Sequence, residues 1–363
     1  MPRRKPALLP ADPQESARIA GLRYILAEGP GILRKRSGKG FCYIGPDAKP
    51  VTDPEDLKRI RSLVIPPAWT NVWICPFKHG HLQAIGRDAR GRKQYRYHPV
   101  YRLIRDQTKF ERMIAFGEVL PAIRKQVQYD LGLQGMPKNK VLATVLKLLE
   151  TTRIRVGNEE YAKTNESYGL TTMREDHVEV SGYTLRFQFR GKSGLEHNIE
   201  VADRRLAKIV HDCQCIPGEE LFHYIDPDGN VCKICSEDVN NYLREITGQD
   251  FTAKDFRTWG GTGHSALELE SIGPASSDVE TKKNIMTAIK AVAKKLGNKP
   301  STCRKYYVHP VVLDSYSDGS LFDFMKKANG SDSPFGLKRE EASVLDLIRS
   351  RKPAISISST KAA

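Results

Sequence analysis

The spacing of apolar residues changes near residue 110, and this change limits the fold more than any other feature of the 363-residue chain. Residues 21–108 are rich in turn residues and short strand-like runs, which predict a small β-rich module. Residues 109–350 place apolar residues mostly at helical spacing, which predicts a mainly α-helical domain. The sequence therefore predicts a two-domain α+β protein, and its clearest helical stripe comprises Val141, Leu142, Val145, Leu146 and Leu149.

The two ends of the chain show neither strand-like runs nor helical spacing. Residues 1–20 are basic and punctuated by proline, so we expect a loose N-terminus. Residues 351–363 have no periodicity, so we expect a disordered tail.

Strands interrupt the helical domain at residues 177–201, where the run HVEVSGYTLRFQFRGKSGLEHNIEV alternates along most of its length. This run predicts strands joined by a tight turn from Arg190 to Gly194. Helices then resume, with Ser236 and Thr252 as expected N-caps. A second apolar stripe ends at Gly297 and consists of Ile285, Met286, Ala288, Ile289, Val292, Ala293 and Leu296.

The charge of the chain indicates an anionic partner. The 58 Lys and Arg residues outnumber the 43 Asp and Glu residues, which gives a net charge of +15. Residues 1–108 carry +12 of this charge, leaving +3 for the rest. The charge does not follow an amphipathic helix with large apolar residues opposite, so nucleic acid is favoured over a membrane surface.

Several protein classes lack support in the sequence. No stretch approaches the roughly 18 apolar residues of a spanning helix, and the N-terminus lacks the apolar core of a signal peptide. We expect a cytoplasmic, nucleoid-associated protein with no membrane partner. The phosphate-loop motif GxxxxGK[ST] is absent, as are HExxH and GxSxG, so we expect no nucleotide cofactor and no metallopeptidase or serine-hydrolase chemistry.

Seven scattered cysteines fit a reducing compartment better than a disulfide framework. Sixteen residues separate the pair Cys213 and Cys215 from the pair Cys232 and Cys235, near the spacing of a zinc ribbon. The first pair has one intervening residue instead of two. Buried or incidental cysteines are therefore favoured over a zinc site, which stays an alternative, and no metal is expected.

Residues 81–99, HLQAIGRDARGRKQYRYHP, predict a hairpin with a turn from Asp88 to Gly91. Neither face of its second strand is apolar, so the hairpin is either a solvated edge or a surface that contacts phosphates and base edges. Period two places Lys93, Tyr95 and Tyr97 on one face and Arg92, Gln94, Arg96 and His98 on the other.

Five polar residues stand at turns or helix ends of the second domain. In ETTRIRVGNEEYAK, Gly157 is the expected helix stop and Asn158 the expected cap of the next helix. Each of the five alone is more often a surface, turn or half-buried residue than a catalytic one. They are Arg155, Lys192, Arg257, Asn298 and Tyr307.

Together with the surrounding motifs, these residues give the chain a family resemblance. Six runs carry it in order: IPPAWTNVWICP, GRDARGRKQYRYHP, TTRIRVGNEEYAKTNESYGLTT, FRGKSG, KDFRTWGGT and CRKYYVHP. The chain resembles the type IB DNA topoisomerases over about residues 31–320, in particular their compact bacterial and poxvirus-like group. The resemblance implies a β-rich DNA-binding domain and a helical catalytic domain of the kind shared with tyrosine recombinases.

The resemblance also implies site residues. Arg155, Lys192, Arg257 and Tyr307 match the family's catalytic positions, whereas Tyr306 and Tyr316 do not. Nuclear and poxviral members carry histidine where this chain has Asn298, which can donate a hydrogen bond to an oxyanion but no titratable proton. The expected DNA contacts are Gln94, Tyr95, Tyr97, Arg92, Lys93, Arg96 and Lys254.

Elementary chemistry agrees with these roles. Attack of a phenol on a phosphodiester builds charge on the non-bridging oxygens, which two guanidiniums can clamp. Lys192 could protonate the leaving 5′ oxygen, and Tyr307 is the expected nucleophile. The expected function is therefore relaxation of supercoiled duplex DNA through a 3′-phosphotyrosyl bond by a monomer, the 3′ polarity resting on the resemblance alone.

Two alternatives remain open. A tyrosine recombinase uses a similar Arg, Lys, Arg and Tyr set but usually carries His-x-x-Arg, where this chain has Lys254 three residues before Arg257. A catalytically silent, architectural DNA-binding protein is the other.

Overall fold

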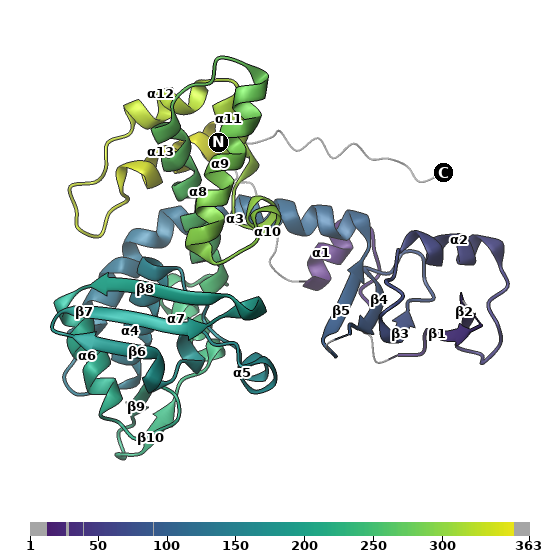
Figure 1. The fold of residues 1–363 in the computed structure, drawn as a ribbon, viewed down its shortest axis with the longest axis horizontal. Helices are drawn as coiled ribbons and strands as arrows, with labels where there is room; N and C mark the ends of the chain where they lie inside the picture. Colours follow the sequence, from purple (N-terminus) through teal and green to yellow (C-terminus); the bar gives the residue numbers. More distant parts are fainter. Residues whose placement is uncertain (1–12, 27–28, 39, 90, 352–363) are drawn as a thin grey trace, which may run out of the picture. The chain divides into compact units, whose positions relative to one another are not determined.

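The computed structural model describes residues 13–26, 29–38, 40–89 and 91–351. The chain divides into two compact units, Met1–Arg112 and Met113–Ala363. The first unit is β-rich and the second mainly helical, as expected for an α+β protein (Figure 1). The expected boundary after residue 108 lies close to this division, and both fall within helix α3, Pro99–Asp130.

The first unit is built on a five-stranded antiparallel sheet with strand order β2-β1-β3-β4-β5. Its core lies between this sheet and helix α2 and contains Ile32, Ile60, Val72, Ile74 and Ala84. The elements are α1 Pro13–Ile19, β1 Ile32–Ser37, β2 Gly40–Ile44, α2 Pro54–Ser62, β3 Thr70–Ile74, β4 Leu82–Arg87 and β5 Lys93–Tyr97.

Helix α1 corrects part of the expected loose N-terminus, which was to extend to residue 20. Ala17 is fully buried and packs with Leu22 and Tyr101. Burial of these apolar side chains offsets the entropy lost on ordering the segment. Residues 1–12, and residues 352–363 of the expected tail, lie outside the described residues.

The second unit combines helices with a three-stranded antiparallel sheet of order β6-β7-β8. Helices α4 and α6 pack against this sheet (Figure 1). The strands are β6 Val178–Ser181, β7 Thr184–Arg190, β8 Glu196–Ala202, β9 His223–Ile225 and β10 Val231–Lys233. The helices are α4 Lys138–Thr152, α5 Glu159–Asn165, α6 Arg204–Gln214, α7 Ser236–Thr247, α8 Ala253–Ile272, α9 Asp278–Leu296, α10 Pro300–Tyr306, α11 Pro310–Ser317, α12 Ser320–Lys327 and α13 Arg339–Ser350, with short 3₁₀ turns at Leu170–Thr172, Glu175–His177 and Lys192–Gly194.

The apolar stripes behave largely as their spacing predicts. All five residues of the α4 stripe are buried, and so are those of the α9 stripe except Met286, which is 41% exposed. Met286 was wrongly placed in the core because it directly follows Ile285, and a residue 100° further round the helix lies at the margin of the buried face.

Two predicted helix ends were wrong. Helix α4 ends at Thr152, where Arg153 adopts a left-handed conformation with φ of 60° and donates its amide to Leu149 O. Gly157, the expected stop, instead lies in the following loop with φ of 113°. Helix α7 begins at Ser236, so its N-cap is Cys235.

The cysteines form no disulfides in the structure. In the described part of the chain, no group of three or more His, Cys, Asp or Glu residues is arranged to hold a metal ion. No helix among the described residues combines the length and apolar character needed to cross a membrane.

Candidate active site

Arg155 lies in the loop that follows α4. Its carbonyl accepts the amide of Leu170 at 2.9 Å, and the carbonyl of Val156 accepts the amide of Thr171 at 2.6 Å. This backbone pairing needs two glycines, because a Cβ on Gly169 would lie 2.6 Å from Gly157 Cα. The glycines therefore permit the backbone hydrogen bonds that position Arg155.

Arg257 comes from the second turn of α8 and is only 4% exposed. As expected, Thr252 caps this helix, and its amide and hydroxyl both bond to Asp255. The Arg257 guanidinium donates to Arg153 O and, at 2.7 Å, to Leu296 O. It thereby joins the loop after α4 to the end of α9.

Asn298 follows the end of α9, where Gly297 adopts the expected left-handed conformation with φ of 59°. Arg155 Nη2 donates to Gly297 O at 3.1 Å and to Asn298 Oδ1. Because a guanidinium only donates hydrogen bonds, this contact fixes which side of the Asn298 amide faces it. Asn298 Nδ2 is left buried with no acceptor among the described residues, so it is a donor available to an anion.

Tyr307 directly follows the short helix α10 and packs against α8. A Cβ on Gly261 would lie 2.5 Å from Tyr307 O, so only glycine permits this approach. Thr262 Oγ1 donates to Thr258 O at 2.8 Å, accepts the amide of His309 at 3.1 Å and lies 3.3 Å from Tyr307 O. The Arg257 guanidinium carbon lies 5.2 Å from the centroid of the Tyr307 ring, within the range of a cation–π contact.

Tyr316 differs from Tyr307 in its surroundings. It is 4% exposed, and its hydroxyl donates to Gly273 O and accepts from Asn284 Nδ2, each at 2.8 Å. These contacts are those of a core residue. Tyr306 is half-buried with the Lys305 ammonium 5.4 Å from its ring centroid.

The electrostatics of the site favour an anion. Burial and the neighbouring Arg257 charge lower the pKa of Arg155 to about 10, while Tyr307 acts in the opposite sense. Burial also lowers the pKa of Arg257. Neither guanidinium forms an ion pair with a carboxylate in the described part of the chain. Two such cations can clamp the oxygens of a phosphodiester.

The remaining predicted catalytic residue is Lys192. It lies on the expected turn between β7 and β8, and its exposed side chain places Nζ 5.3 Å from the centroid of the Tyr161 ring. Contacts link Arg155 with Asn298 and Arg257 with Tyr307, whereas the contact described for Lys192 is the one with Tyr161.

His197 is a residue that the sequence analysis missed. A Cβ on Gly191 would lie 2.6 Å from its imidazole, and a Cβ on Gly297 would lie 2.3 Å from it. The ring also stacks on Phe189 with a centroid separation of 4.8 Å. His197 therefore fills the space between the turn that carries Lys192 and the helix end that carries Asn298. Its place among alternating apolar residues of β8 was the available signal.

The predicted hairpin in the first unit is confirmed, since Arg87 pairs with Lys93 and Ile85 with Tyr95. Lys93 and the two tyrosines are exposed, and the rings of Tyr95 and Tyr97 stack at 6.0 Å. The face formed by Lys93, Tyr95 and Tyr97 is therefore the more accessible one.

The opposite face of this hairpin is engaged within the first unit. Arg92 Nε and Gln94 Nε2 both donate to Asp88 Oδ2, at 2.8 and 3.0 Å. Arg96 donates to Val64 O and lies 5.2 Å from the Trp69 ring. In the second unit, Lys254 is exposed in the first turn of α8.

His197 makes a pH-dependent contribution to stability. Burial and the charges of Arg155 and Arg257 lower its pKa to about 4. An unfolded histidine has a pKa near 6.5, so between about pH 6.5 and 4 only the unfolded chain takes up this proton. We expect the free energy of unfolding to fall on acidification through this range, by up to about 1.4 kcal/mol per pH unit from this group.

Denaturant unfolding of the native protein and His197→Gln at pH 7, 5.5 and 4.5 measures this contribution. The difference in stability between the two should shrink as the pH falls. His211→Gln, which removes an exposed histidine, should parallel the native protein and serves as control. Parallel curves for native protein and His197→Gln would contradict the assignment.

Comparisons with known proteins agree with the site. The family described as eukaryotic DNA topoisomerase I, catalytic core, matches residues 98–328, and the bacterial DNA topoisomerase IB N-terminal domain matches residues 40–88. DNA topoisomerase 1B of Acanthamoeba polyphaga mimivirus is 34% identical over 85% of this chain and 94% of the viral protein. DNA topoisomerase 1B of Vaccinia virus (strain Copenhagen) is 27% identical over 67% of this chain and 75% of the viral protein. These matches favour the topoisomerase interpretation over the recombinase, and the chain belongs to the type IB DNA topoisomerase family.

Proposed function

We propose that the protein relaxes supercoiled duplex DNA by transient cleavage of one strand through Tyr307, followed by religation. It is an isomerase that acts on DNA. The observation that carries the proposal is the pair of guanidiniums near Tyr307, half-buried Arg155 and buried Arg257, with no carboxylate paired to either in the described residues.

In the proposed reaction, the Tyr307 hydroxyl oxygen forms a bond to phosphorus while the bond from phosphorus to the 5′ oxygen breaks. The phenol loses its proton, and the leaving 5′ oxygen gains one and departs as a hydroxyl. The reverse attack by this hydroxyl reseals the strand. We infer a 3′-phosphotyrosyl intermediate from the family resemblance.

The charged and polar groups have separate tasks in this scheme. Arg155 and Arg257 stabilise the charge that develops on the non-bridging oxygens, and Asn298 Nδ2 donates a further hydrogen bond there. One such preorganised donor contributes roughly 3–4 kcal/mol to lowering a barrier. Lys192 protonates the leaving oxygen, which requires its side chain to leave its position over Tyr161.

The DNA contacts of the first unit remain a prediction. We propose that the exposed face formed by Lys93, Tyr95 and Tyr97 meets the duplex first. Arg92, Gln94 and Arg96 would join it after exchanging their present partners, and Lys254 would contact DNA from α8. We propose a monomer that needs no nucleotide, and a cytoplasmic, nucleoid-associated location stays a prediction from the sequence.

A plasmid relaxation assay tests the function. We expect the protein to relax supercoiled plasmid in EDTA without ATP, and the linking number to change in steps of one because one strand is cut. Strict dependence on a metal or nucleotide would contradict the mechanism. Binding without relaxation would support the architectural alternative.

Changing the leaving atom of the DNA substrate distinguishes the role of Lys192 from that of Asn298. An alkoxide needs a proton to leave, whereas a thiol has a pKa near 8.5 and leaves as a thiolate. We expect Lys192→Ala to cut the single-turnover cleavage rate by about 10²-fold or more on normal DNA, and much less when sulfur replaces the bridging 5′ oxygen.

Asn298→Ala is the matched control, because the charge that Asn298 stabilises develops whichever atom leaves. It should be slow on both substrates, and Asn298→His should recover part of the rate because imidazole also donates. If Lys192→Ala reduced the cleavage rate equally on both substrates, Lys192 would be a phosphate contact and not a general acid.

A further inference from the structure

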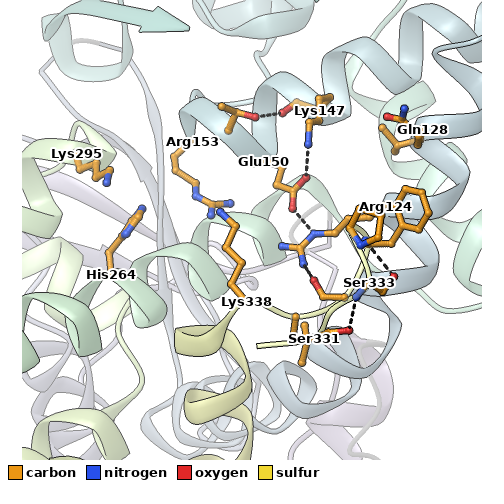
Figure 2. A pocket seen from close by; sticks show the side chains of 16 residues that line it. Arg124, Gln128, Lys147, Glu150, Arg153, His264, Lys295, Ser331, Ser333 and Lys338 are labelled. Atoms are coloured by element: carbon orange, nitrogen blue, oxygen red, sulfur yellow. Dashed lines mark hydrogen bonds and ion pairs between the residues drawn. The ribbon is translucent and has the colours of Figure 1, made fainter. Parts of the chain in front are cut away.

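A cavity of about 620 Å³ lies in the second unit and is lined in part by Arg153. Figure 2 shows basic side chains from several elements around it. Arg153 comes from the end of α4, His264 from α8, Lys295 from α9, and Lys338 from the residue before α13.

The carboxylates near the cavity are already neutralised. Arg124 donates to Glu150 at 2.7 Å and to Glu341 at 2.7 Å, and Lys147 lies 3.7 Å from Glu150. The charges of Arg124 and Lys147 therefore balance those of Glu150 and Glu341. Arg153, Lys295 and Lys338 form no ion pair with a carboxylate in the described part of the chain.

The side chain of Arg153 gives the clearest indication that the cavity binds a ligand. The Arg153 backbone is left-handed, and a Cβ on Gly260 of α8 would lie 2.3 Å from Arg153 Nε. Its Nε and Nη1 atoms are buried and have no hydrogen-bond partner among the described residues. Buried donors without acceptors are costly, so an acceptor supplied by a ligand would stabilise this arrangement.

Like charges converge on the same space. Figure 2 shows Lys338 and Arg153 pointing toward one another, with His264 and Lys295 on the other side of Arg153. Burial, followed by the charges of Lys295, Arg153 and Lys338, lowers the pKa of His264 to about 4. Near neutral pH, His264 is therefore an uncharged hydrogen-bonding group among three cations.

We propose that this cavity binds a small anion of the phosphate class through Arg153, Lys295 and Lys338. Three uncompensated cations favour an anion with at least two negative charges, and guanidinium and ammonium groups suit phosphate oxygens. The volume lies within the range of about 300–1,000 Å³ typical of small-molecule sites. Ser331 and Ser333 add hydroxyl groups to the lining.

The site is separate from the proposed transesterification centre yet shares a residue with it. The carbonyl of Arg153 accepts a hydrogen bond from Arg257, whereas its guanidinium lines the cavity. An anion in this cavity would be a second ligand, bound whether or not Tyr307 acts as proposed.

Calorimetric titration of the full protein with inorganic pyrophosphate at constant ionic strength tests the proposal. We expect the double variant Lys295→Gln/Lys338→Gln to bind at least tenfold more weakly than the native protein. Both lysines are exposed, so the fold should survive. Lys290→Gln/Lys294→Gln is the matched control, because it removes two exposed lysines of α9 that do not line the cavity.

The pyrophosphate affinity of the control variant Lys290→Gln/Lys294→Gln should stay within twofold of that of the native protein. Equal weakening in both double variants, or no weakening in the cavity variant, would overturn the site. Repeating the titration with saturating duplex DNA identifies the source of the phosphate. Retained binding supports a free anion, and binding lost only when DNA is present supports occupation by a backbone phosphate.

Discussion

The buried Arg257 guanidinium connects the segments on which the site depends. It donates to the carbonyl that follows α4 and to the carbonyl at the end of α9, and it lies over the Tyr307 ring. Removing it would leave two carbonyls without these donors, at about 1–3 kcal/mol for each group that stays buried. We therefore expect Arg257 to position the other site residues as well as to bind phosphate oxygens.

Close backbone approach is the second constraint. Gly261 allows Tyr307 to pack on α8, and Gly157 with Gly169 allows the Arg155 loop to pair with the following segment. Gly191 and Gly297 accommodate the two sides of the His197 ring. Side chains at these glycines would displace the backbone that carries the functional groups.

Sequence periodicity was sufficient for helix α4, where burial repeats with the helical period. The hairpin β4–β5 and the turn between β7 and β8 were predicted from glycine-containing turns between strand-like runs. The family resemblance supplied the site residues, and four of the five predicted catalytic residues lie together.

Other features depend on tertiary contacts that a linear pattern does not contain. The end of α4 was misplaced because Arg153, not a glycine, adopts the left-handed conformation. The position of Lys192 over Tyr161, the contacts of His197 and the cation-lined cavity bring together residues far apart in the sequence. Apart from the place of His197 in the alternation of β8, no spacing rule indicated them.

The proposed mechanism depends on Tyr307 as the nucleophile, and mapping the covalent protein–DNA adduct identifies this residue. Cleavage of a suicide DNA substrate, followed by proteolysis and mass spectrometry, should locate the phosphate on Tyr307. Tyr307→Phe should bind DNA almost normally and form no adduct, because only the hydroxyl is removed, while Tyr306→Phe should still form it. An adduct on Tyr306 or Tyr316, or one that persists in Tyr307→Phe, would contradict the account.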